Sequence, residues 1–200
     1  MKKILSILFL YFILAGSGLY AQDVSKSLRE AGAAYESGDL EAARFALRQA
    51  MNEIDLAIGN EVLLLFPETL GDMSAVKADD EVTSAGMGLA GLFVSRTYRM
   101  NDETFVRVQV VGDSPLLAGI NTILALPVLG RDANQKRIRV GSYRALLQKN
   151  QDETGKVSWD LQVPFGSSLL TMEFNGVPEE ALVTEMAHGI PVEQVAKLLQ

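Results

Sequence analysis

The chain has no cysteine, one histidine and one tryptophan among its 200 residues. The absence of cysteine excludes disulfide bonds, thiolate metal ligands and a thiol nucleophile. A single histidine, His188, cannot supply the paired Glu-x-x-His motifs of a di-iron site. We therefore expect no metal ion, and we expect packing alone to stabilise the fold.

Basic residues are also scarce relative to acidic ones. The chain has 18 Lys and Arg against 25 Asp and Glu, a formal net charge of −7. A surface of this sign repels the phosphates of nucleic acids and the head groups of anionic lipids. We therefore expect no nucleic-acid partner.

Long apolar runs are missing except at the N-terminus. Met1-Lys2-Lys3 precedes an apolar run at residues 4–14, and small residues follow up to Ala21. This order is typical of a secretory signal peptide, here residues 1–21 with cleavage before Gln22. A retained anchor is the alternative, but the run is shorter than the roughly 20 residues that span a bilayer. We expect a periplasmic or extracellular protein with no membrane span after processing.

Residues 22–60 are predicted to form a helical hairpin. Apolar residues recur at three- and four-residue steps, interrupted by Ser37-Gly38-Asp39, and Gly59-Asn60 is a typical helix end. The predicted apolar stripe supplies four candidate interaction residues, which are Tyr35, Leu40, Leu47 and Met51.

The segment Ala34-Tyr35-Glu36-Ser37-Gly38-Asp39-Leu40-Glu41-Ala42-Ala43 resembles the middle of a tetratricopeptide repeat. The resemblance covers one repeat, and such arrays need about three repeats to bury their apolar faces. We therefore expect the hairpin to dock on the following domain, on a second copy, or on another protein. A hinge at Gly59-Asn60 favours an outward contact, either self-association or a partner protein.

Residues 61–200 are predicted to form an α+β domain with a mostly antiparallel sheet. Apolar and polar residues alternate over residues 157–174 around a Pro-Phe-Gly-Ser turn, which predicts a hairpin with Trp159 on its apolar face. Residues 92–111 predict a second hairpin, and residues 136–147 predict two further strands. Residues 73–83 are expected to form an exposed loop with one short strand.

Helices are expected to cover this sheet. The uncharged segment 115–126 predicts a core helix that carries two further candidate interaction residues, Leu116 and Ile120. If this helix is only half buried, its free face is a binding patch. Two short helices are predicted after Pro178 and Pro191.

This order of elements resembles the PsbP-like fold of plant photosystem accessory proteins and mycobacterial LpqN-type secreted proteins. The resemblance covers about 135 residues, from a Phe66-Pro67-Glu68-Thr69-Leu70-Gly71 start to a helical end. It implies a non-catalytic accessory or binding role outside the cytoplasm.

One catalytic alternative concerns Gly112-Asp113-Ser114-Pro115, which resembles the start of a secreted esterase class. Ser114 with His188 and Glu185 would make a small serine hydrolase. The competing interpretation is that Ser114 caps a helix and that His188 lies near a helix C-terminus. No oxyanion-hole motif accompanies the serine, so we expect no enzyme.

Two binding alternatives concern a cofactor and an apolar ligand. A GxGxxG match at residues 86–91 lacks the preceding strand and following helix of a dinucleotide site, so we expect no cofactor. An apolar ligand such as a lipid would require a sizeable cavity under the sheet. The preferred interpretation is a secreted, non-enzymatic binding protein.

Overall fold

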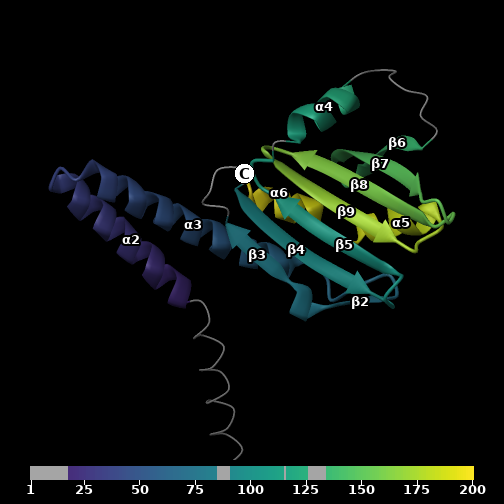
Figure 1. Ribbon diagram of the computed structural model, residues 1–200, viewed down its shortest axis with the longest axis horizontal. Coiled ribbons are helices and arrows are strands. Elements are labelled where there is room, and N and C mark those ends of the chain that lie inside the picture. Colours follow the sequence, from purple (N-terminus) through teal and green to yellow (C-terminus); the bar gives the residue numbers. More distant parts are fainter. Residues whose placement is uncertain (1–17, 85–90, 115, 126–133) are drawn as a thin grey trace, which may run out of the picture. The chain divides into compact units, whose positions relative to one another are not determined.

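The computed structural model describes residues 18–84, 91–114, 116–125 and 134–200 (Figure 1). The chain divides into two compact units, Met1–Ala57 and Ile58–Gln200. The first contains a helical hairpin and the second a sheet with further helices, so the protein is α+β. Among the described helices, none is long and apolar enough to span a membrane.

The hairpin consists of α2 (Gly18–Glu36) and the first part of α3 (Leu40–Leu65). The predicted break at Ser37-Gly38-Asp39 is confirmed, with Gly38 at φ +81°. Asp39 caps α3, because its Oδ1 accepts a hydrogen bond of 3.0 Å from the backbone N–H of Ala42. α2 begins at Gly18, ahead of the predicted cleavage site before Gln22.

The predicted helix end at Gly59-Asn60 is wrong, because α3 continues to Leu65. Gly59 instead lies where the helix approaches the sheet. A Cβ atom there would clash with the side chain of Val82 and come within 2.8 Å of Leu92. The helix ends where Pro67 predicts, because proline disfavours helical backbone at the residue before it.

The described residues of the second unit form a nine-stranded sheet in which every pairing is antiparallel. The strands are β1 (Thr69–Leu70), β2 (Met73–Ala75), β3 (Glu81–Ser84), β4 (Leu92–Arg99), β5 (Phe105–Val111), β6 (Gln135–Val140), β7 (Tyr143–Gln151), β8 (Val157–Phe165) and β9 (Ser168–Asn175). Their order is β1-β2-β4-β5-β9-β8-β7-β6, with β3 beside β4. The predicted hairpins β4–β5 and β8–β9 are confirmed, and so are the two predicted strands β6 and β7, which pair with each other. The single-strand prediction for residues 73–83 is wrong, because β2 and β3 both pair with β4 and a short 3₁₀ helix, η1 (Lys77–Asp79), lies between them.

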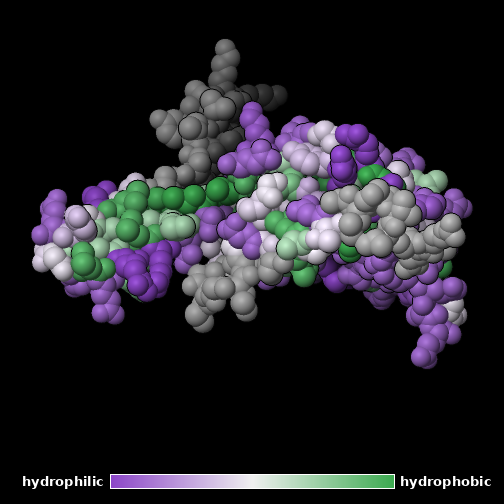
Figure 2. Space-filling view, turned by 90° about the horizontal axis from the view of Figure 1, so that it is seen from above, coloured by the Kyte–Doolittle hydropathy of each residue, from purple (hydrophilic) through white to green (hydrophobic). Residues whose placement is uncertain are grey.

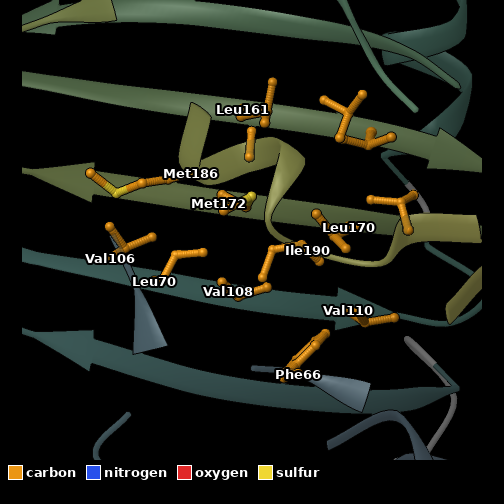
Figure 3. Close-up of a cluster of buried hydrophobic side chains, with 14 of the residues drawn as sticks. Phe66, Leu70, Val106, Val108, Val110, Leu161, Leu170, Met172, Met186 and Ile190 are labelled. Carbon is orange, nitrogen blue, oxygen red and sulfur yellow. The ribbon is translucent and has the colours of Figure 1, made fainter. Parts of the chain in front are cut away.

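One face of the sheet is covered by α5 (Glu180–His188), α6 (Val192–Leu198) and the end of α3. Figure 3 shows Met186 and Ile190 facing Met172 and Val108 across this core. The apolar residues of β8 and β9 alternate into the same cluster, as their period of two predicts.

The opposite face carries α4 (Leu117–Ala125) and is otherwise mixed, with polar residues beside Phe93, Phe105 and Val111. Leu146 of β7 lies between two residues of the main core, so its side chain points to the opposite face. There it packs with Ile120 and Leu124 of α4 in a separate small cluster. The predicted cover of helices is therefore divided, since α4 packs on one face of the sheet and the C-terminal helices pack on the other.

Candidate functional site

The hairpin buries small residues and exposes large apolar ones. Four alanines line the contact between its helices, which are Ala31, Ala43, Ala46 and Ala50. Beside them, the hydroxyl of Ser27 donates a hydrogen bond to the carboxylate of Glu53, at 3.1 Å from each oxygen. Alanine side chains allow close approach of the two backbones, which leaves no space between the helices for larger side chains.

The exposed apolar residues form one surface, here called the hairpin face. It comprises Leu28, Tyr35, Leu40, Leu47, Met51 and Ile54, which are 42 to 70% exposed. Steps of three, four and seven residues place such side chains on one side of each helix. Figure 2 shows apolar residues gathered in a band along the hairpin. All four predicted hairpin interaction residues belong to this face.

A cavity of about 350 Å³ opens in the second unit at one end of the sheet. Its apolar wall includes three methionines, Met73, Met100 and Met186, together with Leu182. Met73 and Met186 are buried, whereas Met100 and Leu182 are 54 and 41% exposed. The buried pair therefore forms the floor, and the exposed pair flanks the opening. Sequence reasoning missed this site, because its lining comes from three turns and a helix that are distant along the chain.

The polar groups at the cavity are acidic. Asp72, in the β1–β2 turn, and Glu185, on α5, both line it and are both exposed. None of the described residues that line the cavity is basic. Within the part of the chain that the structure describes, neither carboxylate forms an ion pair. The cavity thus combines an apolar floor with a negatively charged opening.

The members of the proposed hydrolase triad are not brought together. Ser114 lies at the junction of β5 with α4, where its Oγ accepts a 3.4 Å hydrogen bond from the N–H of Leu116. His188 ends α5, where its Nδ1 lies 2.7 Å from the carbonyl oxygen of Thr184. Ser114 precedes α4 and His188 ends α5, and these two helices pack on opposite faces of the sheet. Glu185 lines the cavity instead.

The two interaction residues predicted on α4 have different environments. Leu116, just before the helix, is 62% exposed, whereas Ile120 is only 6% exposed. The expectation of a core helix is therefore wrong for the outer side of α4, and Ile120 is not a surface residue. The helix is fixed at its end by Arg137, whose Nη2 donates to the carbonyl oxygen of Ile123 at 2.7 Å.

Most of residues 86–91, the rejected GxGxxG match, lies outside the described residues. Comparison of the chain with protein-family models, curated proteins and solved structures finds no match. The hairpin face and the cavity are the two surfaces of this protein that indicate a function.

Proposed function

We propose that this protein is an exported, non-enzymatic accessory protein that binds a second protein chain through the hairpin face. The observation that carries the proposal is the exposure of six large apolar side chains on one side of two helices. Contiguous apolar surface of this kind on a soluble protein marks an interaction site.

The occupant we favour is a second copy of the same hairpin. Two antiparallel helices with one apolar side are half of a four-helix bundle. A two-fold axis would place the hairpin face of one chain on the same face of the other, the commonest arrangement in homodimers. The large side chains would then pack at the centre of the contact, where aromatic residues and methionine are enriched.

The experiment uses a photoreactive benzoylphenylalanine at position 47, with position 45 as the matched control. Phe45 is also exposed, at 68%. Residues two positions apart on a helix point about 160° apart, so Phe45 lies away from the hairpin face. In the exporting cell, we expect a cross-linked dimer from position 47 and none from position 45.

The other outcomes separate the parts of the proposal. A cross-link from position 47 to a different protein keeps the binding function and rejects the homodimer. Cross-linking from neither position, or equally from both, contradicts the function of the hairpin face. Sedimentation equilibrium of Leu47→Asp/Met51→Asp should give the monomer mass at concentrations where the unchanged protein is dimeric.

Carriage of an apolar ligand is a second candidate function, and the cavity is the observation that favours it. Its volume of about 350 Å³ lies at the small end of the usual range for ligand sites. This size suits a small molecule better than a two-chain lipid. The serine hydrolase alternative lacks comparable support, because Ser114 and His188 adjoin helices that pack on opposite faces of the sheet.

A further inference from the structure

The cavity beside α5 is chemically distinct from the hairpin face and belongs entirely to the second unit. Its floor is formed by Met73 and Met186, which are 2 and 8% exposed. Methionine side chains are flexible and polarisable, so they adapt to apolar ligands of differing shape. The floor therefore favours an alkyl or aromatic body over a polar one.

The opening of the cavity favours positively charged ligands. Asp72 and Glu185 approach it from different elements, the β1–β2 turn and α5. Neither has an ion-pair partner among the described residues, so both remain available to a ligand. A cation with N–H donors would form charge-assisted hydrogen bonds there, whereas an anion would be repelled.

From this combination, we infer that the cavity binds a small amphiphilic ammonium ion. Its apolar body lies on Met73 and Met186, and its ammonium group contacts Asp72 and Glu185 at the opening. Thr104, which also lines the cavity, supplies a hydroxyl oxygen as a further acceptor. No covalent step is involved, and the inference is independent of what the hairpin face binds.

The test compares three probes of equal chain length, which are hexylammonium, hexanol and hexanoate. Binding is followed by NMR of the exported protein with ¹³C-labelled methionine methyl groups. Met73, Met100 and Met186 report on the cavity, and Met51 on the hairpin is the reference. We expect saturable shifts of the three lining methyls, with hexylammonium binding roughly tenfold more tightly than hexanoate.

Substitution of the carboxylates tests the charge selection. Asp72→Asn/Glu185→Gln should reduce the preference for hexylammonium over hexanoate to within about twofold, while hexanol binding is retained. The matched control is Glu153→Gln, an exposed glutamate in the β7–β8 loop that does not line the cavity. This control should keep the full preference.

Three results would overturn the inference. If no probe shifts the methyls of Met73 and Met186, the cavity is not a ligand site. If hexanoate binds as tightly as hexylammonium, the cavity does not select cations. Met51 shifts as large as those of the lining methyls would indicate general adsorption to apolar surface. Retained hexanol binding by the doubly substituted variant shows that its cavity is still folded.

Discussion

Arg96 and Asp80 form a bidentate ion pair in which Nε and Nη2 donate to the two carboxylate oxygens at 2.9 and 2.6 Å. Their side chains are 7 and 16% exposed. The remaining nitrogen, Nη1, donates to the carbonyl oxygen of Phe66 at 3.0 Å. A single guanidinium on β4 therefore joins the residue after α3 to the residue before β3.

The first prediction concerns this pair. Arg96→Met should lower the free energy of unfolding by about 3–5 kcal/mol, because Asp80 would be left as an uncompensated, largely buried charge. The matched control is Arg99→Met, since Arg99 pairs with Asp79 at 3.4 Å and both side chains are over 40% exposed. Arg99→Met should lower the free energy of unfolding by less than about 1 kcal/mol. Urea denaturation measures both, and equal losses would contradict the prediction.

The second prediction concerns Tyr98, whose hydroxyl donates to the carbonyl oxygen of Pro67 at 2.8 Å. Burial raises the pKa of Tyr98 to about 12, although Arg96 acts in the opposite direction. A tyrosine in the unfolded chain has a pKa of about 10, so the unfolded state loses its proton first as the pH rises. The contribution of Tyr98 to the free energy of unfolding should be fully present below about pH 10. It should decline by about 2 kcal/mol as the pH rises toward 12.

The measurement for Tyr98 is the free energy of unfolding at several alkaline pH values. Tyr98→Phe is the control, because it lacks the titrating group while keeping the ring. We expect this variant to be less stable at neutral pH and to lose less stability in the alkaline range. Parallel pH profiles for the two proteins would show that Tyr98 is not the responsible group.

The third prediction concerns Trp159, which is 4% exposed, as its position on the apolar face of its strand indicates. Its Nε1 donates to the carbonyl oxygen of Val177 at 3.0 Å. Trp159→Ala should cost about 3–5 kcal/mol by emptying the site. Trp159→Phe should cost less, since the ring volume is partly kept and chiefly the hydrogen bond is lost. Thermal unfolding followed by circular dichroism distinguishes them, and a loss below about 1 kcal/mol for alanine would contradict burial.

The fourth prediction concerns the contact of α6 with the β6–β7 turn. Oε1 of Glu193 accepts a 2.8 Å hydrogen bond from the backbone N–H of Ser142, and this bond lowers the pKa of Glu193. Gly141 has φ +57°, and a Cβ atom there would clash with the Glu193 carboxylate. Gly141→Ala should therefore cost about 2–3 kcal/mol, which combines backbone strain with loss of the contact.

Gly155→Ala is the control for that experiment. Gly155 also has a positive φ, +86°, but the nearest atom to its added Cβ would be Nε2 of Gln151 at 3.6 Å. Only the backbone strain of about 1–2 kcal/mol should remain. Chemical denaturation of both variants is the measurement, and equal losses would show that the Glu193 contact contributes nothing.

Features that depend on neighbouring residues could be predicted from the sequence. The alternation of Trp159 and Leu161 with polar residues fixes which side of β8 is buried, because side chains alternate along any strand. The break at Gly38 and the helix end before Pro67 likewise follow from local backbone preferences. The α+β class and the hairpins therefore follow from the sequence alone.

Features that depend on distant residues were decided by the tertiary structure. Gly59 suggests a helix end by itself, but packing against Val82 and Leu92 makes it a point of close approach inside α3. Arg96 interrupts an apolar face of β4, and its burial there depends on its hydrogen bonds to Asp80 and to the carbonyl oxygen of Phe66. The cavity likewise exists only where residues between 71 and 186 converge. Local periodicity determines elements, whereas burial and charge pairing depend on which elements the fold places side by side.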